Sequence, residues 1–172
     1  MSRNLFSFAL LVAMLVVLVA GNMQAQTVNK NVAATATVMT ALTIDATNMA
    51  FGNIPASKTA VIDPKGLAHQ YVGSGVTVGT VTVTGANSTD VLISWPASIS
   101  LTQSGKTPLT LTLAVNGDAS AANQATAGTL ASGADVVTSG AGNYSLWVGG
   151  SLPAGAETGL FSGNANFSVE YK

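Results

Sequence analysis

Apolar and polar residues alternate with a period of two along most of the chain after its first 25 residues. In residues 28–38 every even position except Lys30 is apolar, and the odd positions other than Ala33 are polar. Leu42 and Ile44 continue this pattern in the same phase. In residues 109–115 a leucine or valine occupies every odd position. A period of two is the signature of a strand with one buried face, so we predict β-strands throughout.

Turn signals divide the chain into short segments. We predict turns at Asn116-Gly117 and at Gly149-Gly150, because these residue pairs favour reversals of direction. Residues 118–142 consist largely of Ala, Gly, Ser and Thr, which predicts a loop-rich connection with one weak strand. No amphipathic helix is evident after the first 25 residues. The pattern therefore predicts an all-β protein, an antiparallel β-sandwich of about seven to nine strands, with a barrel as the alternative.

The first 25 residues have the features of a secretory signal peptide. Arg3 provides the positive start, residues 5–20 are mostly apolar, and a small residue, Ala25, closes the segment. We predict cleavage after Ala25, with a cut after Ala20 as the alternative. The apolar run is shorter than the roughly 20 residues that cross a bilayer, so we expect no stable membrane span after cleavage. The predicted organisation is a signal peptide (1–25), an N-terminal extension or first strand (26–38) and a sandwich domain (39–172).

Composition excludes several functional classes. The chain has 172 residues, only 8% of them charged, with a formal net charge of −1, one His and no Cys. Without a basic cluster it has no field for binding nucleic acid, and without Cys it has no disulfides, zinc fingers or iron–sulfur centres. His69 is the only side chain that titrates near neutral pH, and the seven acidic residues are spread singly along the chain. We therefore predict no enzyme activity, no metal site and no cofactor.

The end of the chain carries the most regular pattern. Large or small apolar residues fill every odd position from Phe161 to Tyr171, apart from Gly163, and Gly159 is the fourteenth residue from the end. This arrangement resembles the C-terminal motif of pilins assembled by the chaperone–usher route. The residues that match the motif are Gly159, Phe161, Phe167, Val169 and Tyr171. The resemblance implies an incomplete immunoglobulin-like sandwich, pairing of this strand with a periplasmic chaperone, an outer-membrane usher, and assembly by donor-strand addition.

Two further stretches resemble a second family. The stretches Met49–Ile54 and Val148–Leu152, followed by the closing strand from Gly159 to Tyr171, are similar to the bacterial secreted family called domain of unknown function 4402. The resemblance spans most of residues 38–172. It implies a secreted or surface protein of Gram-negative bacteria, located in the periplasm, at the cell surface or outside the cell, and it brings no established activity.

The N-terminal segment has the properties of a donor strand. An open sandwich exposes an apolar groove and an unpaired edge, and a neighbour's extended strand would fill both and create an open filament. In residues 26–38 the candidate donor face consists of Val28, Val32, Ala34, Ala36 and Val38. The alternative is that this segment pairs within its own chain as an ordinary first strand, and the sequence leaves both open.

The leading hypothesis is a non-enzymatic, exported structural subunit of a pilus-like fibre or of the cell envelope, with other subunits as partners. The alternative is an extracellular binding module or adhesin for a carbohydrate or protein ligand. Trp147 is its candidate surface aromatic residue, because it lies in the opposite phase to Tyr144, Leu146 and Val148. Burial of Trp147 under a loop is the competing interpretation.

Overall fold

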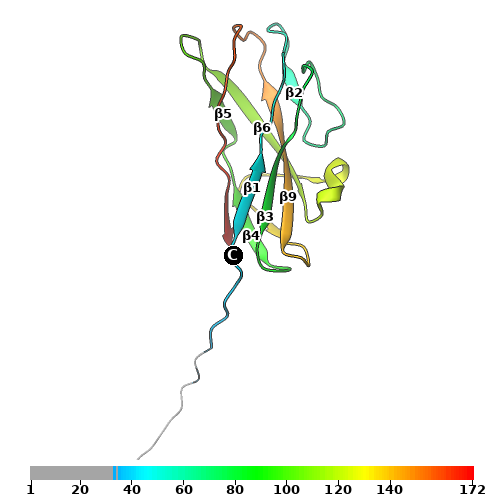
Figure 1. Ribbon diagram of the computed structural model, residues 1–172, viewed down its shortest axis with the longest axis vertical. Helices are drawn as coiled ribbons and strands as arrows, with labels where there is room; N and C mark the ends of the chain where they lie inside the picture. The colour runs from blue at the N-terminus through cyan, green and yellow to red at the C-terminus, as the bar shows by residue number, and fades with distance from the viewer. Residues whose placement is uncertain (1–32, 34) are drawn as a thin grey trace, which may run out of the picture. The chain divides into compact units, whose positions relative to one another are not determined.

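The computed structural model describes residue 33 and residues 35–172. Residues Val38–Lys172 form one unit of two antiparallel sheets, which confirms the predicted all-β sandwich (Figure 1). In chain order the described elements are β1 (Thr43–Thr47), β2 (Ala60–Ile62), β3 (Gly79–Thr84), β4 (Asp90–Ser94), β5 (Ser98–Leu101), β6 (Leu109–Asp118), the 3-10 helix η1 (Ala121–Thr126), β7 (Gly128–Leu130), β8 (Ala134–Val137), β9 (Asn143–Leu152) and β10 (Ser168–Tyr171).

The larger sheet has seven strands, with the order β1-β3-β9-β6-β5 along its main path. Two short strands share edges with longer ones: β2 pairs with the end of β9 beyond β3, and β7 pairs with β6 beyond β5. β9 and β6 are the two ten-residue strands and pair with each other over Thr112–Asp118 and Ser145–Ser151. This pair is the centre of the larger sheet.

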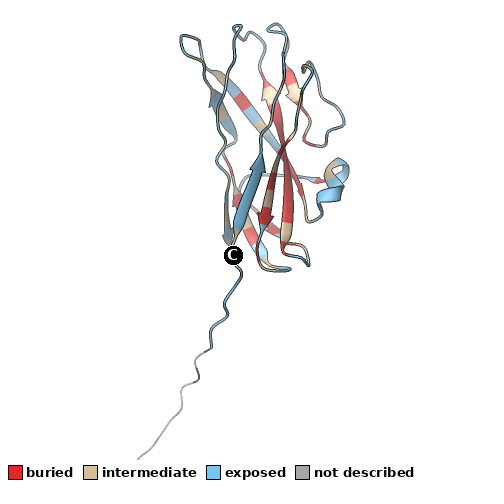
Figure 2. Ribbon diagram, in the orientation of Figure 1, coloured by how far each residue is buried: buried red, intermediate tan, exposed pale blue. Residues whose placement is uncertain are grey.

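The smaller sheet has the order β10-β4-β8. Its inward residues pack against those of β3 and β9, because strands with one apolar face must cover that face with a second layer. The buried residues of both sheets form the core, and Figure 2 shows much of the burial along β3 and β9. Its buried members are Val81, Val83, Val91, Ile93, Trp95, Val115, Val136, Tyr144, Leu146 and Val148.

The two predicted turns, Asn116-Gly117 and Gly149-Gly150, are wrong. Both pairs lie inside long strands, the first in β6 and the second in β9. A Cβ on Gly149 would lie 2.2 Å from the Ile62 carbonyl oxygen, and one on Gly150 would lie 2.3 Å from the Thr112 carbonyl oxygen. These glycines therefore allow neighbouring backbones to approach within a sheet, a role of strand glycines that a dipeptide pattern does not distinguish from a turn.

The small-residue stretch 118–142 contains more regular structure than the sequence indicated. Besides η1 it provides β7, which pairs with β6, and β8, which pairs with β4. Its few large apolar residues give no long alternation, so pairing with strands distant in sequence determines its structure. Among the residues that the structure describes, none forms a helix long and apolar enough to span a bilayer.

Candidate functional site

The edge strands β1 and β10 of the two sheets lie on the same side of the sandwich, since the Tyr171 hydroxyl of β10 is bonded to the Thr40 carbonyl just before β1. We call this side, lined by β1 and by residues 161–171, the open flank. Figure 1 shows the C-terminal segment, drawn in brown to red, between β5 and β1. Two sets of bonds place its ends: Ser162 pairs with Thr102 just after β5, and β10 pairs with β4. The first and last strands of the domain therefore border the same flank.

The β1 side of the open flank lacks cover. Ile44 pairs with Val83 and Ala46 with Val81, so both point to the inner face of the larger sheet. Val83 is fully buried, yet Ile44 remains 38% exposed and all five residues of β1 are exposed. The inner face of β1 therefore extends beyond the layer that should cover it (Figure 2).

The C-terminal side of the open flank follows the predicted alternation. From Phe161 to Tyr171 every odd residue except Gly163 is half-buried, and every even residue is exposed. Val169 pairs with the fully buried Ile93, and the Phe167 ring stacks on Trp95 with the ring centroids 5.7 Å apart. The inward side chains of this segment thus contact the core on one side only.

The predicted motif residues are brought together along this segment. Phe161, Phe167, Val169 and Tyr171 all belong to the half-buried face. Gly159 precedes it, is exposed and has a φ of +156°, and it lies directly against the Gln103 side chain. The C-terminal pattern therefore identified one wall of the flank.

Both strands that border the open flank have an unpaired edge. Within residues 35–172, β1 pairs only with β3, and β10 pairs only with β4. Their outer N–H and C=O groups are therefore available to another strand. An unpaired strand edge beside incompletely covered apolar side chains can accept an extended peptide whose alternate side chains point inward.

The candidate donor strand falls mostly outside the described residues. Val28, Val32 and Ala34 lie there, so their pairing stays a prediction. Ala36 and Val38 are described, and both are exposed and outside any strand; Val38 is 94% exposed. The structure thus assigns neither of these two residues to a strand of its own domain.

One bond network connects the two walls of the open flank. The Ala86 N–H donates to the Tyr171 hydroxyl over 2.6 Å, and this hydroxyl donates to the Thr40 carbonyl over 2.6 Å. The alternating pattern predicted the hydrophobic role of Tyr171 but not these polar contacts, because residue 40 is 131 positions away. For the β1 side of the flank, which carries Ile44 and Ala46, the only sequence signal was the shared phase of Leu42 and Ile44.

Trp147 is not a surface aromatic residue. It lies on the outer face of the larger sheet, as its phase predicted, but it is only 5% exposed. Its cross-strand neighbour Asn116 is also buried and donates to the Ala127 carbonyl, at the end of η1, over 2.9 Å. The η1 segment contacts both β6 and β9. It therefore covers part of the outer face of the larger sheet, which the strand pattern did not predict.

His69 has a structural role in the loop that follows β2. Its Nδ1 accepts a bond of 3.1 Å from the Asp63 N–H. The Asp63 carboxylate in turn accepts bonds from the backbone N–H groups of Lys65, Leu67 and Ala68. These bonds close a local turn, as Asp side chains often do. Among the described residues, no group of three or more His, Asp or Glu side chains could hold a metal ion.

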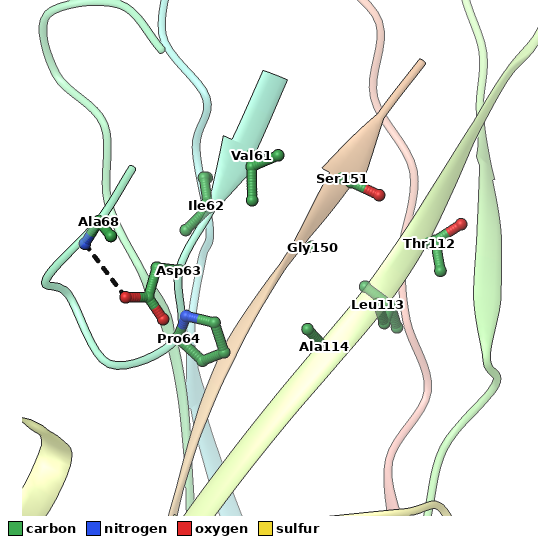
Figure 3. A pocket seen from close by; sticks show the side chains of 10 residues that line it. All are labelled: Val61, Ile62, Asp63, Pro64, Ala68, Thr112, Leu113, Ala114, Gly150 and Ser151. Atoms are coloured by element: carbon green, nitrogen blue, oxygen red, sulfur yellow. Dashed lines mark hydrogen bonds between the residues drawn. The ribbon is translucent and has the colours of Figure 1, made fainter. Parts of the chain in front are cut away.

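A shallow hollow of about 410 Å³ lies beside this loop. Figure 3 shows it between β2, β9 and β6, with Val61, Thr112 and Ser151 on its walls. The Asp63 carboxylate at its rim is already bonded to the loop (Figure 3). The lining offers small apolar groups and two hydroxyls and no charged side chain free for chemistry.

Electrostatic effects in the domain are few. Burial, with a smaller contribution from Asp118, raises the pKa of the Tyr144 phenol. Hydrogen bonds from Thr107 and Lys106 lower the pKa of the Glu157 carboxyl, and the bond with Asp135 raises the pKa of the Lys172 ammonium. Both groups lie at the surface: the pKa shift of Glu157 comes mainly from the Thr107 backbone N–H, and that of Lys172 from its pairing with Asp135.

Comparison with known families addresses the same part of the chain. The model of the family described as domain of unknown function (DUF4402) matches residues 42–171. The chain belongs to this family. The matched region begins at Leu42, just before β1, and ends at Tyr171, so the DUF4402 domain coincides with the sandwich and includes both walls of the open flank. No curated protein sequence matches the chain.

Proposed function

We propose that this chain is an exported, non-enzymatic structural subunit that assembles with further copies, or with related subunits, into a pilus-like or surface fibre. In this proposal residues 26–38 of one copy fill the open flank of the next. The observation that supports it is the incomplete cover of the flank: Ile44 faces inward from β1 and is still 38% exposed, while its partner Val83 is fully buried. A strand that covers the open flank would complete the core.

Length and pattern favour the N-terminal segment as that strand. Extended at about 3.3 Å per residue, residues 26–38 would span about 43 Å, and the wall formed by residues 161–171 spans about 36 Å. The segment also presents an apolar face at alternate positions, which suits a flank bordered by the half-buried side chains of residues 161–171 and by the exposed inner face of β1. Its edge groups would pair with those of β10, because one edge of that strand is unpaired in the described residues.

An open flank is also a hazard before assembly. Exposed strand edges beside apolar side chains promote non-specific association. A temporary occupant would prevent it, which is the role that the resemblance to chaperone–usher pilins gives to a periplasmic chaperone, with an outer-membrane usher as the site of assembly. These two partners are part of the proposal.

A deletion tests the proposal. The full chain is expressed with its signal peptide, beside a variant that lacks residues 26–38 and keeps the signal peptide. We expect the recovered full chain to form high-mass assemblies in size-exclusion chromatography and filaments in electron microscopy. We expect the deletion variant to remain monomeric and to bind a synthetic peptide of residues 26–38.

Substitutions on opposite faces provide the matched control. Val32→Asp places a charge on the apolar face of the segment and should abolish assembly, because a buried unpaired charge is costly. Asn31→Asp places the same charge on the polar face and should leave assembly unchanged. Equal behaviour of the two variants, or a full chain that remains a stable monomer, would overturn the proposal.

The alternative function, an extracellular binding module or adhesin, loses Trp147 as its candidate contact residue. The Trp147 side chain is 5% exposed, on a covered part of the outer face of the larger sheet. It therefore cannot serve as a platform for a ligand.

A further inference from the structure

Tyr171 lies between the open flank and the end of the N-terminal segment of the same copy. Its backbone belongs to β10, which has one unpaired edge within residues 35–172, and pairs with Val91 of β4. Its hydroxyl is bonded to the Thr40 carbonyl, three residues before β1 begins. The Tyr171 side chain therefore connects β10, which borders the open flank, with residue 40, which lies just after the N-terminal segment 26–38 of the same copy.

The hydroxyl is closely packed and both accepts and donates a hydrogen bond. It accepts from the Ala86 N–H and donates to Thr40, both over 2.6 Å. A Cβ added at Gly85 would come within 2.7 Å of the hydroxyl oxygen and 2.6 Å of the Leu42 side chain. The absence of a side chain at residue 85 thus lets Tyr171 and Leu42 pack side by side, and a displacement of one is transmitted to the other.

We propose that Tyr171 is a positioning residue that couples occupancy of the open flank to the order of residues 38–42 in the same copy. This inference rests on the proposed function. A strand bound to the edge of β10 fixes residues 168–171, and Tyr171 then holds the Thr40 carbonyl in place. Because such coupling is reciprocal, a copy whose flank is filled presents its own N-terminal segment from a fixed base. A new copy would then bind more readily to the N-terminal segment of a copy already in the fibre than to that of a free copy.

Hydrogen exchange read by mass spectrometry tests the coupling. The full chain is kept dilute enough to remain monomeric by light scattering and is measured with and without a saturating synthetic peptide of residues 26–38. The peptide should slow exchange in residues 168–171 and also, by about fivefold, in residues 38–42; a factor of this size corresponds to one net hydrogen bond. In Tyr171→Phe the first effect should remain and the second should disappear.

Tyr71→Phe is the matched control. Tyr71 is 53% exposed, and loss of its hydroxyl should leave both effects as in the unmodified chain. A Tyr171→Phe variant that retains the slowed exchange at residues 38–42 would overturn the inference, although the proposed function would stand. A peptide that slows exchange at neither place would overturn the proposed function, and the inference with it.

The unmodified chain alone decides the matter if Tyr171→Phe does not fold. Slowing at residues 168–171 together with residues 38–42 supports the coupling. Slowing at residues 168–171 without any change at residues 38–42 contradicts it, because the Thr40 bond would then transmit nothing.

Discussion

Glycine has different roles at different positions in this domain, and Gly149 shows how much depends on a single missing Cβ. In β9 its backbone lies so close to Ile62 that an added Cβ would meet the carbonyl oxygen at 2.2 Å. Gly128 in β7 has no atom within 4 Å of such a position. The difference is one of packing, since both glycines lie in strands.

We expect Gly149→Ala to lower the free energy of unfolding by about 3 kcal/mol, because the carbonyl belongs to a paired strand and cannot move away cheaply. Gly128→Ala should change it by less than about 1 kcal/mol. Urea denaturation followed by tryptophan fluorescence measures both. Similar values for the two variants would mean that β2 yields easily and that the close approach has no structural importance.

Tyr144 links stability to alkaline pH. Its pKa is raised, first by burial and then by Asp118, so the folded state favours the neutral phenol. The stabilisation is complete below the ordinary tyrosine pKa of about 10 and is lost as the pH rises through the higher value in the folded protein. We expect the free energy of unfolding to fall more steeply above pH 10 in the unmodified chain than in Tyr144→Phe.

Chemical denaturation at a series of pH values tests this expectation. Tyr71→Phe is the control, because it also removes one phenol hydroxyl but from an exposed side chain. If Tyr144→Phe kept the same slope as the unmodified chain, the buried phenol would not be the group responsible.

At the scale of elements, the pairing of each strand predicts its local stability. β9 and β6 have neighbours on both edges, whereas β1 and β10 are each paired on one edge in the described part of the chain. Strands with unpaired edges and exposed inner faces open at low free-energy cost. We expect amides of β9 and β6 to exchange only with global unfolding and those of β1 and β10 to exchange much faster in the monomer.

Hydrogen exchange resolved by segment gives this comparison directly. β8 is the internal control, because it is also an edge strand of four residues but carries the buried Val136 into the core. Exchange of β1 as slow as that of β9 in the monomer would show that the open flank is closed by other means.

The strands themselves were largely predictable, because a period of two survives in sequence wherever one face of a strand is buried. Residues 109–115 and 161–171 show this best, and both alternate in burial as expected. Position in the sheet was not predictable in the same way. Gly149-Gly150 reads as a turn in any local window, and only its pairing with residues distant in sequence places it in the middle of β9.

The candidate site was half predictable for the same reason. The alternating residues that end at Tyr171 identified one wall of the flank from sequence alone. The phase of Trp147 correctly placed it on the outer face, but the cover provided by η1 comes from a stretch of small residues with no apolar pattern. The bonds of the Tyr171 hydroxyl depend on a turn and a segment far away in the chain, which no local pattern encodes.

At the scale of the whole molecule, the question is whether residues 26–38 fill the flank of their own copy or of another. The absence of Cys makes the answer accessible, because any disulfide must involve introduced residues. Ser168 lies in β10 with its side chain exposed, and a strand added to that edge would place its own outward residues beside it. The outward residues of the segment are the polar ones, among them Asn29, Asn31 and Thr35.

We expect one of three single variants, Asn29→Cys, Asn31→Cys or Thr35→Cys, to form a disulfide with a separate chain carrying Ser168→Cys when the two are mixed and oxidised. Directly opposed residues on paired antiparallel strands have Cα atoms about 4.5–5.5 Å apart, which is within the range that a disulfide spans. Thr110→Cys, on an exposed position of β6, should not cross-link with any of them. A double variant that closes the bond within one chain, while the mixed single variants stay unlinked, would show that the segment completes its own domain and that the fibre proposal is wrong.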